Sequence, residues 1–182
     1  MKQDSNTQDM RIDDAIRKIP DFPKPGVLFY DITSVLKDPA VFSHCINEMK
    51  VWVSSLKVDA VAAVDARGFL FAAPVAKDLA LPLILVRKKG KLPGDVLQES
   101  FALEYGNDTI EVHADDVPTG GRVVIVDDLI ATGGTLAASA SLFEKGGAEL
   151  AGVCAVIGLP FLNYAERLQG VPTKTLVEYY SE

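Results

Sequence analysis

Four short apolar runs constrain the fold of this chain more than any other feature of its sequence. They are four to seven residues long, nearly free of charge, and cover residues 58–64, 81–86, 123–126 and 153–157. Runs of this kind are typical of parallel strands that are buried on both faces. Helical candidates lie between them at residues 68–79 and 135–144, the second ending before Gly146 and Gly147. This alternation predicts an open, mostly parallel twisted α/β sheet flanked by helices.

The N-terminal part and one internal segment depart from this alternation. Residues 10–19 space apolar side chains along one side of a helix that ends before Pro20, and the proline-rich residues 20–26 must be irregular. Residues 27–32 predict a short strand. Asp38 and Pro39 then begin a helix that continues to Leu56, with Asp38 as its cap.

Residues 97–113 predict a β-hairpin rather than another strand and helix. Two strands, 98–105 and 108–114, are joined through Gly106, Asn107 and Asp108, which are residue types that favour tight turns.

Size and charge limit the class of protein. A chain of 182 residues predicts one domain, and a formal net charge of −7 disfavours a nucleic-acid partner. No apolar run approaches the roughly 20 residues that span a bilayer, and the polar N-terminus does not resemble a secretory signal. The two widely separated cysteines, Cys45 and Cys154, fit a reducing compartment. We therefore expect a cytoplasmic protein without a nucleic-acid or membrane partner.

The segment between the apolar run 123–126 and the following helix has the features of a phosphate site. It contains Ala131, Thr132, Gly133, Gly134 and Thr135. The N–H groups at the start of a helix have no partner within the helix, and paired glycines let the backbone approach a phosphate closely. The same residues are also compatible with an ordinary turn between a strand and a helix. No lysine follows the glycines, so this is not a Walker loop.

Two adjacent carboxylates, Asp127 and Asp128, favour the functional interpretation. Burying them unpaired at the end of an apolar strand would be costly. Carboxylates accept hydrogen bonds from the vicinal hydroxyls of a ribose and stabilise positive charge that develops on a sugar ring. A ligand with a terminal phosphate and, one sugar away, a cationic centre would satisfy both the glycines and the acids. This pattern predicts transfer of a phosphoribosyl group.

The leaving group of such a transfer would be pyrophosphate, which requires cations. Arg67, in the turn Asp65-Ala66-Arg67-Gly68, and the basic run from Arg87 to Lys91 are available. Taken alone, the basic run is also compatible with a solvated loop. We expect Mg²⁺ to accompany the phosphates, and the sequence contains no His and Cys cluster typical of a transition-metal site.

At these residues the sequence resembles the type I phosphoribosyltransferases, whose hallmark is an apolar run, two acids and a small-Thr-Gly-Gly-Thr loop. Within that family it is most similar to members that use adenine. The likeness extends along nearly the whole chain, in five segments: DFPKPGVLFYDIT at 21–33, DARGFLFAAPVA at 65–76, RKKGKLPG at 87–94, ALEYG at 102–106 and VIVDDLIATGGT at 124–135.

The resemblance implies the activity, fold and partners of this family. The reaction would transfer the phosphoribosyl group of 5-phosphoribosyl pyrophosphate (PRPP) to adenine, giving AMP and pyrophosphate, with Mg²⁺ held mainly through PRPP and water. The protein would be a cytoplasmic homodimer. Its single domain, residues 1–182, would carry a small N-terminal hood at 1–35 and a flexible lid hairpin at 87–113.

The resemblance also implies a role for individual residues. Ala131, Thr132, Gly133, Gly134 and Thr135 would bind the 5′-phosphate, and Asp127 and Asp128 would face the ribose hydroxyls. Pyrophosphate would be bound by Asp65, Ala66, Arg67, Arg87, Lys88 and Lys91, with a cis peptide bond between Asp65 and Ala66. Adenine would be bound by Leu28, Phe29, Tyr30 and Leu159. Glu104 in the lid would manage the purine proton, although it is equally compatible with a surface position on the lid.

Two positions depart from the pattern of this family and leave alternatives open. Gly158 stands where many relatives have an acidic residue, and Tyr30 stands where relatives carry other large residues. Both lie near the implied base site, so a phosphoribosyltransferase for another base remains an alternative. A regulator that senses PRPP or a nucleotide without catalysis is the other, although the acidic charge argues against the nucleic-acid face that it would need.

Overall fold

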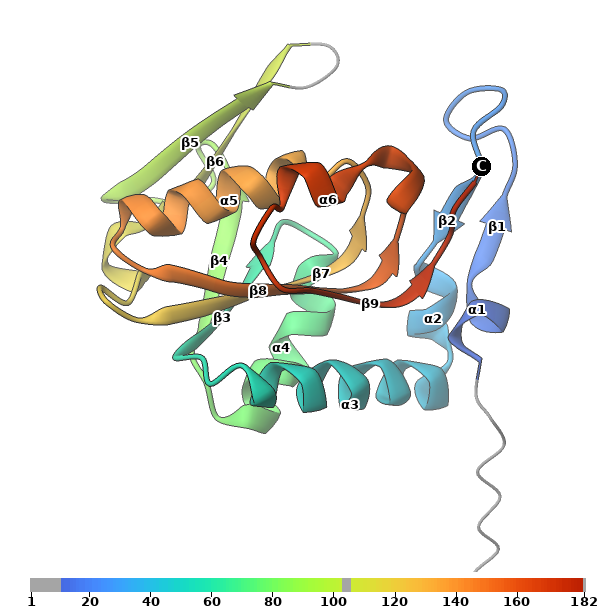
Figure 1. Ribbon diagram of the computed structural model, residues 1–182, viewed down its shortest axis with the longest axis horizontal. Helices are drawn as coiled ribbons and strands as arrows, with labels where there is room; N and C mark the ends of the chain where they lie inside the picture. The colour runs from blue at the N-terminus through green and yellow to red at the C-terminus, as the bar shows by residue number, and fades with distance from the viewer. Residues whose placement is uncertain (1–10, 103–105, 182) are drawn as a thin grey trace, which may run out of the picture. The chain divides into compact units, whose positions relative to one another are not determined.

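The computed structural model of the protein describes residues 11–102 and 106–181 (Figure 1). These residues form two compact units, residues 11–45 and residues 46–181. The second unit contains a seven-stranded sheet, and the first contains a separate two-stranded sheet. No helix in the described ranges is both long and apolar enough to cross a membrane.

The seven-stranded sheet of the second unit is mostly parallel, as the apolar runs predict. Its strand order is β5-β6-β4-β3-β7-β8-β9. Strands β4, β3, β7, β8 and β9 run parallel, whereas β6 pairs antiparallel with both β4 and β5. The strands are β3 (Ala60–Val64), β4 (Leu83–Lys88), β5 (Val96–Ala102), β6 (Asn107–His113), β7 (Arg122–Ile130), β8 (Glu149–Gly158) and β9 (Thr173–Glu178).

Helices cover both faces of this sheet, so its central strands are buried on each side (Figure 1). Helix α4 (Gly68–Leu79) and the end of α3 (Pro39–Ser55) lie on one face, and α5 (Gly134–Lys145) lies on the other. All five residues of β3 are buried. Phe71 of α4 and Phe143 of α5 are fully buried as well. Burial on two faces explains why these strands are apolar without alternation.

The order of the strands places a crevice at the carboxyl ends of β3 and β7. β3 pairs with β4 on one side and with β7 on the other. The chain leaves β3 through α4 toward β4, and it leaves β7 through α5 toward β8, which lies in the opposite direction. In open α/β sheets, ligands bind where two such connections diverge. The fold therefore predicts a site at this edge.

In the first unit, the structure differs from the long helix predicted at residues 10–19. A short helix, α1 (Ile12–Ala15), is followed directly by strand β1 (Arg17–Ile19), which pairs antiparallel with β2 (Phe29–Asp31). Ser34, in helix α2 (Thr33–Lys37), accepts a hydrogen bond from the Arg17 N–H at 2.9 Å and donates one to the Ala15 carbonyl at 2.6 Å. These non-local bonds replace the helical bonds that the local apolar pattern favoured.

Other expected elements are confirmed or shifted. Asp38 caps α3, because its Oδ1 accepts the N–H groups of Ala40 at 3.0 Å and Val41 at 3.2 Å. Asn107 and Asp108 belong to strand β6 rather than to the hairpin turn. Strand β9, helix α2 and the short helix α6 (Tyr164–Arg167) were not expected, because their sequences are short and have no continuous apolar pattern.

Gly152 in β8 marks the closest approach of α3 to the sheet. A Cβ atom at this position would lie 2.8 Å from the Trp52 ring and 2.9 Å from the Leu56 side chain. Larger residues would force these groups apart. We expect Gly152→Val to lower the free energy of unfolding by about 1–3 kcal/mol, the usual cost of overpacking a core. Urea denaturation measures this difference.

Val51→Ala provides the matched control, because Val51 precedes Trp52 in α3 but is 69% exposed. We expect this variant to stay within about 0.5 kcal/mol of the wild type. Unchanged stability of Gly152→Val would contradict the packing described for α3 and β8.

Candidate active site

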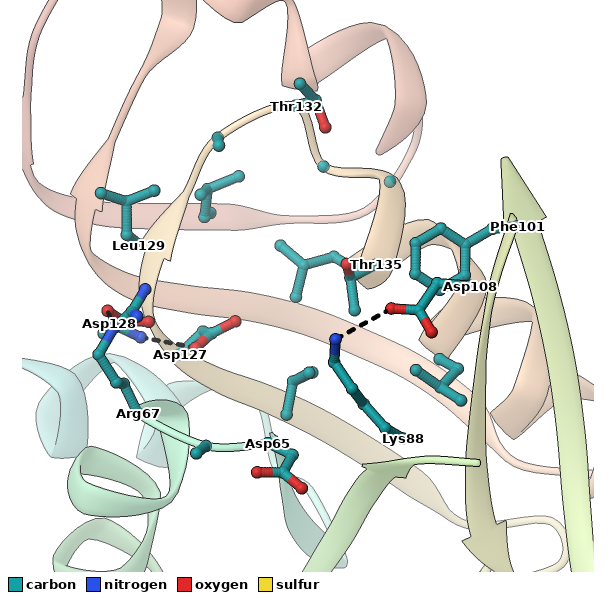
Figure 2. A pocket seen from close by; sticks show the side chains of 18 residues that line it. Asp65, Arg67, Lys88, Phe101, Asp108, Asp127, Asp128, Leu129, Thr132 and Thr135 are labelled. Carbon is teal, nitrogen blue, oxygen red and sulfur yellow. Dashed lines mark hydrogen bonds and ion pairs between the residues drawn. The ribbon is translucent and has the colours of Figure 1, made fainter. Parts of the chain in front are cut away.

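A pocket of about 320 Å³ opens at the carboxyl ends of β3 and β7, where the strand order places a crevice (Figure 2). Residues 64–67 at the end of β3 form one wall, and residues 127–136 of β7, the following loop and the start of α5 form another. The remaining wall comes from the β4–β6 region, through Lys88, Phe101, Asp108 and Ile110.

The loop that the sequence assigned to a phosphate lies entirely in this pocket. All five of its residues line the cavity: Ala131, Thr132, Gly133, Gly134 and Thr135. Gly133 has a φ of +75°, and a Cβ atom there would lie 3.2 Å from the Cβ of Tyr164. Gly134 is the first residue of α5, so the N–H groups of this first turn, whose residues line the cavity, have no partner inside the helix. Backbone amides and the helix dipole together favour an anion here.

Gly133 and Gly134 meet different constraints, although they are neighbours. Gly133 needs the left-handed conformation that other residues adopt at a cost. At Gly134 the first atom that a Cβ would meet is Nη1 of Arg167, at 3.4 Å. Arg167 is exposed and flexible, and the sequence pattern gave no indication that α6 would bring its guanidinium to the start of α5.

The two aspartates lie inside β7 rather than at its end, because β7 continues to Ile130 alongside β8. Asp128 is 5% exposed, and its Oδ2 accepts a hydrogen bond from Nε of Arg67 at 2.5 Å. Asp127 points to the other side of the strand, and its Oδ1 accepts the Asp128 N–H at 2.8 Å (Figure 2). Both side chains line the pocket, as the sequence predicts.

The environment of Asp127 disfavours its charged form. Burial and then the negative charge of Asp128 raise the pKa of the Asp127 carboxyl well above its ordinary value, while Arg67 acts in the opposite direction. A positive charge placed near Asp127 would reverse this shift, because it stabilises the carboxylate. The site is therefore suited to a cationic centre or a metal-bound ligand.

The cations at the site are each held by a carboxylate. Arg67 pairs with Asp128, and Lys88 Nζ lies 3.3 Å from Asp108 Oδ2 (Figure 2). Outside the cavity wall, Arg87 Nε donates to Asp65 Oδ2 at 3.1 Å. The peptide bond between Asp65 and Ala66 is cis, as the resemblance implies.

Not every predicted residue lies in this pocket. Arg87, Lys91 and Leu159 are outside its wall, and Leu28, Phe29 and Tyr30 belong to the first unit. Glu104 lies outside the described residues. Phe101 and Asp108 line the cavity although they were assigned no role. Asp108 and Ile110 share one face of β6, so the period-two pattern of a strand was the signal that could have found Asp108.

The departure at Gly158 has a structural reason. Gly158 ends β8 opposite Glu178 of β9, and a Cβ atom there would lie 2.7 Å from Thr175 and 3.0 Å from the Tyr164 hydroxyl. Glu178 accepts hydrogen bonds from Thr175 at 2.7 Å and Tyr164 at 3.2 Å. The hydroxyl groups, led by that of Tyr180, lower the pKa of the Glu178 carboxyl. The side chains of Thr175 and Tyr164, both hydrogen-bonded to Glu178, thus fill the space beside Gly158.

The described residues contain no group of three or more His, Cys, Asp or Glu side chains arranged to hold a metal ion. Mg²⁺ commonly binds through one or two carboxylates, several waters and the phosphates of a substrate. The carboxylates of this pocket are compatible with Mg²⁺ that is bound in this way, through few protein ligands.

Comparison with known proteins agrees with the geometry. Residues 31–173 match the phosphoribosyl transferase domain family. The adenine phosphoribosyltransferase of Treponema denticola is 57% identical over 175 residues, which are 96% of this chain and 92% of that protein. The crystal structure of adenine phosphoribosyltransferase from Thermoanaerobacter pseudethanolicus superposes with a TM-score of 0.89 at 46% identity, covering 92% of this chain and 98% of the other.

A further solved structure was determined with ligands. Adenine phosphoribosyltransferase from Saccharomyces cerevisiae, complexed with D-2,5-dideoxy-2,5-imino-altritol 1,6-bisphosphate and adenine, has a TM-score of 0.87 at 35% identity. The likeness covers 91% of this chain and 96% of the yeast protein.

The contrast between the two loop glycines can be tested by the same substitution at each. Gly133→Ala places a Cβ in the left-handed region and against Tyr164, so we expect the free energy of unfolding to fall by about 1–2 kcal/mol and the affinity for ribose 5-phosphate to fall with it. Gly134→Ala begins a helix, where alanine is favoured, and should leave stability unchanged or higher. Urea denaturation and calorimetric titration measure both. Equal losses in the two variants would contradict the assigned backbone constraint.

The raised pKa of Asp127 predicts a pH-dependent gain in stability for Asp127→Asn. Above the ordinary Asp pKa of 3.8 the unfolded chain releases this proton while the folded protein retains it, so the folded state loses relative stability as pH rises through the raised pKa. Asparagine cannot ionise. We expect the variant to be more stable than the wild type at about pH 7.5, with the difference vanishing near pH 4.

Urea denaturation at both pH values measures this, and Asp116→Asn, at an exposed position, is the control. A variant that is less stable than the wild type at neutral pH would show that Asp127 is not disfavoured as an anion.

Proposed function

The chain belongs to the adenine phosphoribosyltransferases, and we propose that it transfers the 5-phosphoribosyl group of PRPP to adenine, releasing AMP and pyrophosphate. One observation carries the proposal: a bare amide loop, residues 131–135, and two acidic residues of β7 line the same cavity. The loop suits the phosphate end of a phosphoribosyl group, and the acids suit its sugar. The reaction would serve purine salvage.

The 5′-phosphate would bind to residues 131–135, where α5 begins. Its oxygens would accept hydrogen bonds from backbone N–H groups and from the hydroxyls of Thr132 and Thr135. Support comes from the position of all five residues in the cavity wall and from the 12-residue length of α5, whose dipole favours an anion at this end.

Asp127 and Asp128 would face the ribose hydroxyls during the transfer. As the bond between C1 of the ribose and pyrophosphate breaks, positive charge develops on the sugar, and N9 of adenine then forms the new bond to C1. The raised pKa of Asp127 supports this role, because a buried carboxyl that ionises with difficulty gains most from a nearby cation. Stabilisation would then be stronger in the transition state than in the ground state.

Pyrophosphate would be bound by the turn Asp65-Ala66-Arg67 and by the cations Arg87, Lys88 and Lys91. Three of these cations have carboxylate partners in the ligand-free chain, namely Arg67, Arg87 and Lys88. Phosphate oxygens would take over from those carboxylates. Bound Mg²⁺ would neutralise pyrophosphate charge in the leaving group, and it would be held mainly through PRPP and water, near the carboxylates of the pocket.

Adenine would be bound by Leu28, Phe29, Tyr30 and Leu159. Leu28 and Tyr30 would offer backbone groups to the base edge, and Phe29 and Leu159 would contact the faces of the ring. A strand edge supplies both N–H donors and C=O acceptors, which match the amine and ring nitrogens of adenine. A 6-oxo purine would leave some of these groups unpaired, and such mismatches discriminate strongly.

The remaining parts of the proposal concern the lid and the assembly. Residues 87–113 would form a lid that closes over the site and excludes water, and Glu104 of this lid would take the purine proton. Residues 1–35 would form a hood within one catalytic domain, residues 1–182. We also propose a homodimer and a cytoplasmic location. The two cysteines, Cys45 and Cys154, are buried thiols and not a disulfide, which fits a reducing compartment.

The alternatives lead to different results in one assay. A sensing regulator would bind PRPP without forming AMP, and a phosphoribosyltransferase for another base would favour that base in competition. The relatives named above do not favour either alternative. We expect the purified protein to form AMP from adenine, PRPP and Mg²⁺, and to use adenine in preference to hypoxanthine and guanine.

Asp128→Asn tests the catalytic assignment within that assay. Loss of the negative charge beside the sugar should lower kcat by about 10²–10³-fold, the usual effect of removing one electrostatic contact to a transition state. Asp116→Asn, an equal charge change at an exposed position, should retain wild-type turnover. Wild-type kcat in Asp128→Asn would show that this carboxylate does not act on the sugar.

A further inference from the structure

Glu111 of β6 is a buried carboxylate to which neither the sequence nor the proposed reaction gives a role. It is 1% exposed, less than Asp128 at 5%, which lies in the pocket. Glu111 does not line that pocket. A buried charge is costly unless hydrogen bonds or opposite charges compensate for it. Its partners therefore indicate what the residue is for.

The partners of Glu111 are backbone N–H groups of the basic loop that follows β4. Its Oε1 accepts hydrogen bonds from the N–H of Lys91 at 2.8 Å and of Leu92 at 2.9 Å. Its Oε2 lies 3.4 Å from the Gln98 amide nitrogen. Burial opposes ionisation, but these donors together with the N–H of Gly90 hold the pKa of the Glu111 carboxyl below its ordinary value. The group is therefore an anion at neutral pH.

This anion gives the turn after β4 two further hydrogen bonds to the sheet, beyond those of the strand pairing. The pairing of β4 with β6 ends at Lys88 and Ile110, with one further bond from the Lys89 N–H to the Thr109 carbonyl at 2.9 Å. Gly90 then takes a φ of +82°, and the Lys91 N–H also lies 3.2 Å from the Lys88 carbonyl. The two hydrogen bonds to Glu111 fix the C-terminal half of this turn, at Lys91 and Leu92.

Contacts continue from the turn to the wall of the pocket. The carbonyl of Lys91 lies 3.5 Å from Nη1 of Arg87, and Nε of the same arginine donates to Asp65 at 3.1 Å. Asp65 lines the cavity and begins the turn proposed to meet pyrophosphate. Glu111 thus lies at the far end of a continuous series: carboxylate, Lys91 peptide, Arg87 guanidinium and Asp65.

The charge of Glu111 also suits the composition of the segment. Arg87, Lys88, Lys89 and Lys91 are four cations within five residues, and like charges this close repel one another. A carboxylate buried at the base of the turn offsets part of that repulsion without occupying any side-chain position that an incoming anion would need.

We propose that Glu111 is a positioning residue for the pyrophosphate end of the substrate: its carboxylate fixes the 88–92 turn and, through it, the direction of Arg87 and Lys91. The inference rests on the proposed function of this site. Glu111 does not touch the substrate. Its removal should therefore weaken binding of the pyrophosphate group and leave the 5′-phosphate and base contacts intact.

Glu111→Gln is the first test, because glutamine keeps the size of the side chain but loses the charge and one acceptor. We expect the affinity for pyrophosphate with Mg²⁺ to fall about tenfold, the usual effect of losing a hydrogen bond to a charged group, and KM for PRPP to rise by a similar factor. AMP affinity and KM for adenine should stay within about twofold, since neither ligand carries the pyrophosphate group.

Glu111→Asp keeps the charge and shortens the reach by one methylene group, so it tests the same geometry in a variant that retains a buried anion. We expect its pyrophosphate affinity to fall between those of the wild type and Glu111→Gln. Glu144→Gln, on the exposed end of α5, makes the same charge change away from the loop and should match the wild type in every measurement.

The outcomes separate this inference from the proposed function. Equal losses of pyrophosphate and AMP affinity in both Glu111 variants would indicate a general structural role and overturn the proposal, as would unchanged pyrophosphate affinity in both. A wild-type protein that forms no AMP would instead contradict the proposed function, because the Glu111 comparison starts from an active enzyme.

Discussion

The ion pair between Arg67 and Asp128 joins the two strand ends on which the pocket is built. Asp128 is buried within β7, and Arg67 belongs to the turn after β3. An unpaired carboxylate at that depth would cost several kcal/mol, so the pair constrains the turn as strongly as it constrains the strand. Gly68 adds a second constraint, because a Cβ there would lie 2.7 Å from Oδ1 of Asp127. The turn after β3 and the acids of β7 therefore form one rigid surface.

The charge of that surface determines which ligands it can accept. Four carboxylates, Asp65, Asp108, Asp127 and Asp128, line the cavity with two cations, Arg67 and Lys88, among the described residues. A polyanion entering this pocket meets excess negative charge unless it brings a cation. Burial is the main cause of the raised pKa of the Asp127 carboxyl, and the negative charge of Asp128 adds to it. A substrate that arrived with Mg²⁺ and became cationic at its sugar, as proposed, would compensate for this negative charge and would make the acids compatible with a neighbouring phosphate loop.

The sequence predicted those parts of the fold and site that are determined by neighbours along the chain. The apolar strands, α4 and α5 have local signals, and each is confirmed as an element. The helix predicted at residues 10–19 was wrong, because strand pairing with β2 and a hydrogen bond to the Ser34 hydroxyl outweighed the helical pattern of the sequence. Glu111 was missed because the backbone N–H groups from which it accepts hydrogen bonds lie 19–20 residues away. Side chains that position a site without lining it can be identified only from their contacts. Contacts between residues far apart in the chain produce no periodic pattern in a single sequence.

The location of the polar groups explains how the sheet tolerates them. Val123 to Val126 of β7 are fully buried, and the polar pair follows within the same strand, just beyond the last residue of β7 that pairs with β3. Ile130, two residues beyond Asp128 on the same strand, is fully buried again. Burial of each such aliphatic side chain contributes about 1.5–3 kcal/mol, enough to offset a carboxyl in an unfavourable environment. The apolar runs that specify the fold therefore also supply the free energy that offsets two unfavourable features: the left-handed backbone at Gly133 and the buried carboxyl of Asp127. A less apolar sheet could not offset both.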